Sequence, residues 1–172
     1  MSLDGFVAGP SQGVENPLGV GGMRLHEWVF PLRAWRAMHG MPGGEVNESN
    51  RVVEESLANL GATVFVLTHH PREPLRLEGG TTFTFVTEGI EAALDGARRA
   101  AAGKDVSLAG GAKAAQQYLA AGLVDEMQIS LVPILVGGGE RLFENVGDDL
   151  RGLELVATTA APNVTHLKYA RA

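Results

Sequence analysis

The stretch DVSLAGGAKAAQQYLAAGLVDEMQISLVPILVGGGERLF, residues 105–143, decides the fold of this chain. Its apolar run at residues 106–109 predicts a buried strand, and the glycine pair that follows predicts a tight turn. Residues 112–121 are strong helix formers followed by a glycine, which predicts a short helix. Glycines at a strand-to-helix turn let a ligand approach the backbone, where the helix N-terminus attracts anions. The pattern suits a pyrophosphate, although most such glycine pairs only close a turn.

A second strand and a second glycine cluster strengthen this interpretation. Residues 127–136 predict a strand parallel to the first, because a single helix connects the two. The glycines at 137–139 follow directly and would lie at the same edge of the sheet as the first pair. Open α/β sheets bind their ligands at that edge.

The composition fits a globular domain and excludes several function classes. The chain has 172 residues, 45% of them hydrophobic, with no break in composition, which predicts a single domain over residues 1–172. The absence of cysteine excludes disulfides and thiolate chemistry and agrees with a cytoplasmic location. A net charge of −6 argues against nucleic-acid binding. No apolar run reaches the roughly 18 residues of a membrane span.

The rest of the chain alternates between predicted helices and strands. Helices are expected over residues 27–38, 50–60, the latter capped by Asn47 or Ser49, and 90–102. Strands are expected over residues 63–68, 81–87, 153–160 and 164–169, the last two as an antiparallel hairpin about a Pro-Asn turn. This order predicts an α/β fold with a mixed sheet covered on both faces.

Four segments resemble the dihydrofolate-reductase-like family, in particular the C-terminal reductase domain of the bifunctional riboflavin-pathway deaminase-reductase. They are SLDGFVAGP (2–10), VFVLTHHPR (64–72), VSLAGGAKAAQQYLAAGLVDE (106–126) and LVPILVGGGERLF (131–143). They cover about a third of the chain, in the family's order. The resemblance implies a three-layer α/β/α domain with a mixed, mostly parallel sheet. It also implies that NADPH binds along the carboxyl edge of that sheet and that hydride goes to a pteridine-like or aminopyrimidine-like small molecule.

The resemblance assigns roles to individual residues. Asp4 is the expected catalytic residue and faces the substrate. The expected cofactor-binding residues are Val7, Ala8, Thr68, His69, His70, Arg72, Leu108, Ala109, Gly110, Gly111, Ala112, Lys113, Val136, Gly137, Gly138 and Gly139. Residues 110–113 would hold the pyrophosphate, residues 68–72 the adenosine ribose and its 2′-phosphate, and residues 7–8 the nicotinamide side.

Several of these residues also have plainer interpretations. Asp4 precedes a glycine, a common turn pair, and a role in proton transfer would require burial to raise its pKa. His69 and His70 are equally consistent with solvated loop residues, and adjacent strand positions point to opposite faces, so no metal site is expected. Trp28 is a candidate for stacking on the substrate but is also a typical core residue. Ser130 lies in a predicted strand without an evident His and acid partner, which leaves a hydrolase triad unsupported.

Two departures from the family pattern bear on function. Riboflavin-pathway reductases usually carry an acidic residue where this chain has Ala109, placed to bind ribose hydroxyls of the substrate. Losing that carboxylate costs recognition on the order of a thousandfold, which argues against the riboflavin intermediate as substrate. Relatives also have a longer first strand and a further turn, helix and loop near residues 63–65. We therefore expect residues to be missing before Met1 and near residues 63–65; the alternative is a real deletion.

The leading hypothesis is an NADPH-dependent oxidoreductase that acts on a small molecule, without nucleic-acid or membrane partners. The alternative is a catalytically silent NADP-binding or interaction module of the same fold. A third, weaker hypothesis is a flavin-binding protein, since glycine loops also hold flavin phosphates. A homodimer through residues 129–136 and the C-terminal hairpin is expected, as in relatives.

Overall fold

The computed structural model describes residues 1–58, 63–148, 150 and 152–172. The strands are β1 (Phe6–Ala8), β2 (Thr63–Leu67), β3 (Leu75–Arg76), β4 (Thr82–Val86), β5 (Glu126–Leu131), β6 (Glu140–Arg141), β7 (Leu153–Ala161) and β8 (Val164–Arg171). The helices are the 3₁₀ turn η1 (Gly22–Leu25), α1 (Arg33–Met38), α2 (Glu48–Ala58), α3 (Ile90–Ala101) and α4 (Ala112–Ala120). No helix among these residues combines the length and the apolar character needed to cross a membrane.

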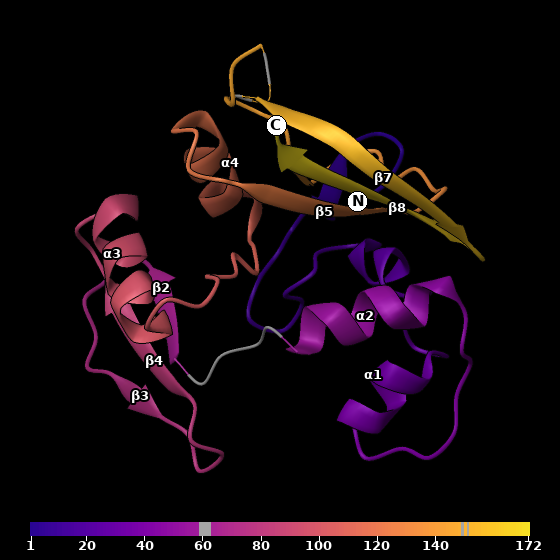
Figure 1. Ribbon diagram of the computed structural model, residues 1–172, viewed down its shortest axis with the longest axis horizontal. Coiled ribbons are helices and arrows are strands. Elements are labelled where there is room, and N and C mark those ends of the chain that lie inside the picture. The colour runs from indigo at the N-terminus through magenta and orange to yellow at the C-terminus, as the bar shows by residue number, and fades with distance from the viewer. Residues whose placement is uncertain (59–62, 149, 151) are drawn as a thin grey trace.

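The strands form three separate sheets within the described residues, where the sequence predicted a single mixed sheet. Their orders are β1-β6, β2-β4-β3 and β5-β8-β7. The sheet of β2, β4 and β3 lies with α3 on one side of the molecule, and the sheet of β5, β8 and β7 lies apart from it above α2 (Figure 1). The mixture of helices and strands confirms the α/β class, whereas the described residues do not show the expected three-layer arrangement in detail.

The prediction of a strand at residues 106–109 is wrong. The absence of this strand fits the division of the predicted sheet into separate sheets. The segment carries no strand assignment, and Val106 and Leu108 are exposed. No described strand pairs with this segment, and the sheets that contain β2 and β5 lie in different parts of the molecule (Figure 1). Without neighbours there is no hydrogen-bond ladder to hold it. The proposed parallel βαβ unit therefore does not form.

The strand β5 is shorter than predicted and pairs in the opposite sense. It ends at Leu131, and its neighbour β8 runs antiparallel to it, with Ser130 opposite His166. Beyond β5, residues 132–136 are held by an isolated bridge between Val132 and Ser2. The predicted C-terminal hairpin is confirmed: β7 and β8 are antiparallel about a turn in which Asn163 takes a φ of 62°.

The first predicted helix is shorter than expected because of Pro31. A helix over residues 27–38 was predicted, but α1 begins only at Arg33, after an extended Leu32. Proline lacks an N–H and its ring blocks the preceding turn, so a helix starts more easily after it than through it. The second helix, α2, begins at Glu48, two residues before the predicted start, and the predicted cap at Asn47 is confirmed because the Ser49 N–H donates to Asn47 Oδ1 at 3.0 Å. Its predicted end, at Leu60 and Gly61, lies outside the described residues.

The helix α4 ends as predicted, at a glycine in the left-handed region. Gly122 has a φ of 66°, its N–H donates to the Leu119 carbonyl, and the Leu123 N–H donates to the Tyr118 carbonyl. This pair of bonds is the Schellman arrangement, which satisfies the last carbonyls of a helix. The start of α4 is different, because no side chain caps it.

Two small hydrophobic clusters stabilise the part of the molecule that contains α1, α2, α4 and the sheet of β5, β8 and β7. One joins α1 and α2 around the fully buried Leu32, with Val53 from α2 against it. The other lies beneath α4, where Leu119 contacts Val146 and Leu153. A polar contact links these parts, because the buried Ser49 of α2 reaches His166 of β8.

Candidate functional site

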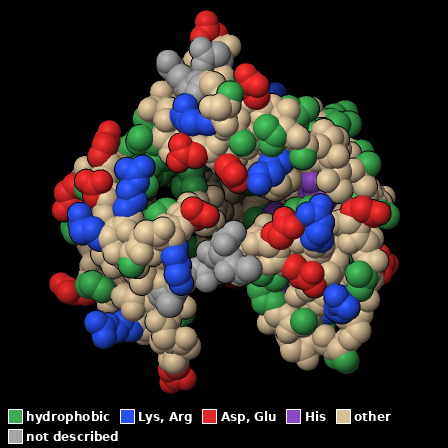
Figure 2. Space-filling view, in the orientation of Figure 1, with side chains coloured by type: hydrophobic (Ala, Val, Ile, Leu, Met, Phe, Trp, Pro, Cys, Tyr) green, Lys and Arg blue, Asp and Glu red, His purple; other side chains and the backbone are tan. Residues whose placement is uncertain are grey.

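A cavity of about 960 Å³ lies where β1, α4 and β5 meet, and it brings together a little under half of the predicted site residues. Its lining includes Val7, Ala8, Trp28, Ala109, Gly110, Gly111, Ala112 and Lys113, all predicted from the sequence. The space-filling view is hollowed near the middle of the molecule, between the upper sheet and the body that carries α3 (Figure 2). The cavity volume is in the usual range for a small-molecule or cofactor site.

The glycine turn forms one wall of this cavity. Gly111 is the N-cap of α4, and the first helical bond runs from the Ala115 N–H to the Gly111 carbonyl. The N–H groups before Ala115 therefore have no acceptor within the helix. Gly110 has a φ of 120°, which requires glycine, and the peptide bond to Gly111 is cis. A Cβ built on either glycine would meet no atom within 4 Å, so this wall opens onto free space.

Trp28 and β1 line the same cavity and come from the N-terminal part of the chain. The Trp28 indole N–H donates to the Leu25 carbonyl at 3.0 Å, and its ring meets His166 edge-on with centroids 5.1 Å apart. These two contacts fix the plane of the indole. Val7, Ala8 and Trp28 therefore line the same cavity as the glycine turn, and their roles in binding stay predictions.

Polar residues on β5 complete the cavity and were missed by sequence reasoning. Gln128 and Ser130 both line it. Ser130 does have a histidine partner, because its Oγ lies 3.0 Å from His166 Nδ1. Alternating polar residues within an apolar strand were the available signal, but only the pairing of β5 with β8 reveals the histidine. The remaining lining residues are Met1, Gln12, Pro17, Leu18, Leu25, His26, Ser56, Ala115, Glu140 and Leu142.

Both histidines near this cavity favour the neutral form. Burial lowers the pKa of His26 and also the pKa of His166. Two charged side chains also line the cavity. Lys113 contributes a positive charge from the first turn of α4, and Glu140 contributes a negative charge. The described residues contain no group of three or more His, Cys, Asp or Glu side chains that could hold a metal ion.

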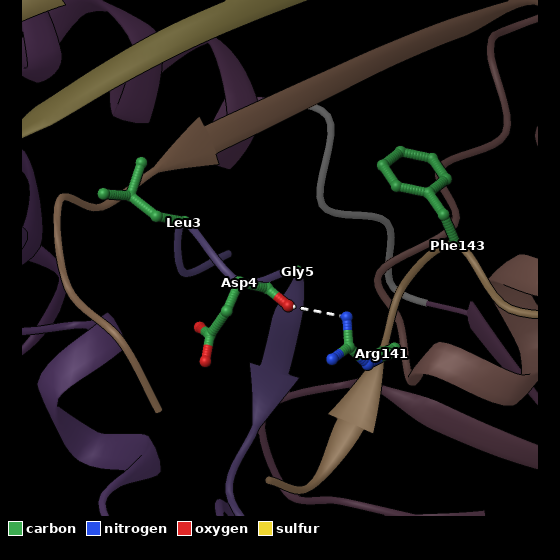
Figure 3. A pocket seen from close by; sticks show the side chains of 5 residues that line it. All are labelled: Leu3, Asp4, Gly5, Arg141 and Phe143. Atoms are coloured by element: carbon green, nitrogen blue, oxygen red, sulfur yellow. Dashed lines mark hydrogen bonds between the residues drawn. The ribbon is translucent and has the colours of Figure 1, made fainter. Parts of the chain in front are cut away.

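Asp4 lies outside this cavity, at a smaller hollow of about 410 Å³ lined by Leu3, Asp4, Gly5, Arg141 and Phe143 (Figure 3). Its carboxylate points away from the Arg141 guanidinium, which instead donates to the Asp4 backbone carbonyl at 2.8 Å. The carboxylate accepts the N–H groups of Val136, at 3.1 and 3.2 Å, and Gly137, at 2.8 Å. Asp4 therefore anchors the loop that follows β5.

The pKa of Asp4 moves in the direction opposite to the one a proton relay requires. Hydrogen bonding from the Ser2 hydroxyl, then from the Gly137 and Val136 N–H groups, lowers the pKa of Asp4 to about 2 and outweighs partial desolvation. The condition that a proton-transfer role would require, a raised pKa, is not met, because three donors stabilise the charged form. At neutral pH the side chain is a carboxylate.

The second glycine cluster lies next to β1 and not on the larger cavity. A Cβ on Gly139, whose φ is 122°, would fall 2.1 Å from the Ala8 carbonyl oxygen. This glycine is therefore required by the close approach of two backbone segments. Val136, Gly137, Gly138 and the exposed Leu108 are likewise absent from the described lining of the cavity. These five predicted residues are thus not part of the described cavity lining.

The loop at residues 68–72 follows β2, whose sheet also contains β4 and β3 and lies beside α3. Thr68 Oγ1 accepts the His70 N–H at 3.1 Å, and the Arg72 guanidinium lies 4.9 Å from the centre of the Phe85 ring. None of Thr68, His69, His70 and Arg72 is among the described residues that line the larger cavity. The structure therefore does not bring this part of the predicted cofactor site into the cavity that contains the glycine turn.

Comparison with known proteins places the chain in a family. A structure from Shewanella sp. PV-4, whose name assigns it to riboflavin biosynthesis, is 21% identical, with a TM-score of 0.56 over 100% of this chain and 95% of that one. A pyrimidine reductase-like protein from Corynebacterium diphtheriae is 14% identical, with a TM-score of 0.49 over 99% of this chain and 88% of that one. No curated protein sequence matches. The model of the RibD C-terminal domain family matches residues 1–167, and this chain belongs to that family.

Proposed function

We propose that this protein is a riboflavin-pathway-type reductase that uses NADPH to reduce a pteridine-like or aminopyrimidine-like molecule. Family membership supports the reductase class. The observation that carries the proposal is the single cavity in which the glycine turn and the start of α4 face residues of β1 and Trp28. A dinucleotide needs a phosphate-binding end and a flat apolar end, and this cavity offers both.

The residues of the cavity fit the two ends of the cofactor. The open space at Gly110 and Gly111 lets an anion approach the backbone, where unpaired N–H groups and the helix dipole favour it. Lys113 adds a positive charge, which matters in a chain with a net charge of −6. Val7 and Ala8 supply an apolar wall for the nicotinamide. When bound, NADPH supplies the hydride; the protein's own task is to align the partners and exclude water.

Gly111→Ala tests the phosphate end with little risk to folding. Gly111 has a φ of −68°, which any residue adopts, and its Cβ would meet no protein atom. We expect the thermal unfolding temperature to stay within a few degrees, while NADPH affinity falls about tenfold or more because the methyl group occupies the space of the pyrophosphate. Titration of NADPH fluorescence measures the affinity. Unchanged affinity in a folded variant would remove the assignment of the turn.

The preference for NADPH over NADH is a separate prediction. Arg72 and His69 were expected at the 2′-phosphate, and Arg72 now lies on Phe85, away from the larger cavity. The assignment of Arg72 and His69 to the 2′-phosphate predicts that wild-type protein binds NADPH more tightly than NADH. It also predicts that Arg72→Ala removes this difference in affinity. Equal affinities of the wild-type protein for the two cofactors would contradict it.

The catalytically silent module remains the second candidate, and two observations favour it. Ala109 stands where riboflavin-pathway reductases usually carry an acidic residue, and residues 68–72 and 136–139 are absent from the described cavity lining. This candidate predicts NADPH binding without turnover of pteridines, dihydrofolate or aminopyrimidines. Steady NADPH oxidation with any of these would eliminate it.

A further inference from the structure

Two polar residues of β5 face the larger cavity from the same side of their sheet. Gln128 and Ser130 are two positions apart, so their side chains point to one face. Both line the cavity, as does Trp28. Sheet pairing sets His166 of β8 directly opposite Ser130, and Lys168 opposite Gln128. This wall is distinct from the glycine turn and carries hydrogen-bonding groups beside a fixed aromatic ring.

Ser130 is held by a buried histidine that has a second serine partner. His166 Nδ1 lies 3.0 Å from Ser130 Oγ, and His166 Nε2 lies 2.7 Å from Ser49 Oγ. His166 and Ser49 are each 1% exposed, whereas Ser130 is only half-buried and reaches the cavity. Only one of the two serines that satisfy His166 is therefore available to a ligand.

The described contacts of His166 include no carboxylate. The groups that face its ring are Ser49, Ser130 and Trp28, so the arrangement differs from a Ser-His-Asp triad. A neutral imidazole donates from one nitrogen and accepts at the other. With Nδ1 protonated, Ser130 keeps its own O–H free to donate to a ligand; with Nε2 protonated, Ser130 donates to His166 and offers lone pairs. Exchange of tautomers lets Ser130 meet either kind of group.

We propose that Gln128 and Ser130 form the subsite for the lactam edge, the adjacent N–H and C=O, of a planar heterocyclic substrate. The Gln128 amide has both a donor and an acceptor, which match that edge, and Ser130 meets the neighbouring exocyclic group. Trp28 covers the ring face. His166 is a positioning residue that acts through Ser130. This inference rests on the proposed function and names the substrate chemistry that its cavity selects.

Pterin and 5,6-diaminouracil are suitable probes because both carry a lactam edge, and 3-methylpterin is a control because its edge is blocked. Isothermal titration with wild-type protein should show pterin binding at least tenfold more tightly than 3-methylpterin. Gln128→Leu and Ser130→Ala should each weaken pterin binding about tenfold and leave NADPH affinity unchanged. Equal binding of pterin and 3-methylpterin, or unchanged pterin affinity in both variants, would overturn the subsite.

Failure of the subsite and failure of the proposed function are distinguishable in the same experiment. Binding of NADPH without binding of either lactam probe overturns the subsite and leaves the cofactor assignment standing. Binding of pterin that depends on Ser130, without binding of NADPH, supports the subsite and contradicts the proposed function.

Ser49→Ala is the matched control for Ser130→Ala, because each removes one hydroxyl partner of His166. Both should lower the unfolding temperature, but only Ser130→Ala should weaken pterin binding. A parallel loss of affinity in both variants would mean that the network is merely structural.

Substitutions of His166 distinguish the roles of its two ring nitrogens, of which Nδ1 contacts Ser130 and Nε2 contacts Ser49. An Asn side chain can replace Nδ1 and a Gln side chain can replace Nε2, so His166→Asn should keep pterin affinity closer to wild type than His166→Gln. The opposite order would contradict the positioning role. If neither His166 variant folds, the comparison of pterin affinity between Ser49→Ala and Ser130→Ala tests the positioning role without them.

Discussion

At the scale of single residues, Asp4 shows how an ion can stabilise a loop without entering the larger cavity. The Ser2 hydroxyl and two backbone N–H groups lower its pKa to about 2, from an ordinary value of 3.8. A depressed carboxyl pKa gives stability that is present above about pH 4 and is lost as the pH falls toward 2. Asp4→Asn should therefore lower the unfolding temperature at pH 6 but hardly at pH 2. Circular dichroism melts of both proteins across this range measure it, and a difference independent of pH would contradict the assignment.

Gly138 and Gly139 are neighbours with opposite tolerance for a side chain. A Cβ on Gly139 would lie 2.1 Å from the Ala8 carbonyl oxygen, whereas on Gly138 its nearest neighbour would be the Pro10 ring at 4.0 Å. Gly139→Ala should cost about 2–4 kcal/mol of unfolding free energy through overlap and backbone strain. Gly138→Ala should cost less than about 1 kcal/mol. Urea denaturation of both variants measures the difference; similar values would show that β1 does not approach this loop as described.

At the scale of elements, α3 approaches β2 closely at Gly96. A Cβ on Gly96 would lie 2.7 Å from Cε1 of the Phe65 ring. Ala is favoured over Gly in a helix by about 1 kcal/mol, but the overlap is expected to outweigh this gain. Gly96→Ala should thus destabilise the protein by about 1–3 kcal/mol, and Phe65→Leu in the same chain should restore part of the loss. A stabilising Gly96→Ala would mean that α3 does not pack on Phe65.

Elements were predictable from sequence where local chemistry decides them, and not where distant pairing does. Asn47 at the start of α2 and Gly122 at the end of α4 are local signals, and both were confirmed. The run at residues 106–109 has the composition of a buried strand, but its state depends on whether two other strands reach it. The contact between Ser130 and His166 spans 36 residues and follows only from the register of β5 on β8. The sequence therefore predicted the part of the cavity lining at the glycine turn, but it did not predict Gln128 and Ser130 on the face of β5.

At the scale of the whole molecule, the free edge of the C-terminal sheet bears on assembly. Within the described residues β7 pairs with β8 on one side, and its Leu155 and Val156 are 52% and 56% exposed. An exposed apolar edge strand favours association with a second copy. We expect a homodimer by light scattering, and a monomer after Leu155→Lys with Val156→Lys. Leu77→Lys, at a comparably exposed leucine, is the control. A wild-type monomer at tens of micromolar would contradict the expectation.

No side chain caps the start of α4, and if the proposed anion binds there, the stability of the folded chain would depend on the supply of that ligand. A helix whose first N–H groups lack partners gains more from a bound anion than one that a side chain already caps. Any ligand that binds only the folded state adds about 2.7 kcal/mol at a hundredfold excess over its Kd. In a cell, such a protein would resist proteolysis when the ligand is abundant and be cleared when it is scarce. The missing cap would thus make turnover of the protein respond to the concentration of the molecule it binds.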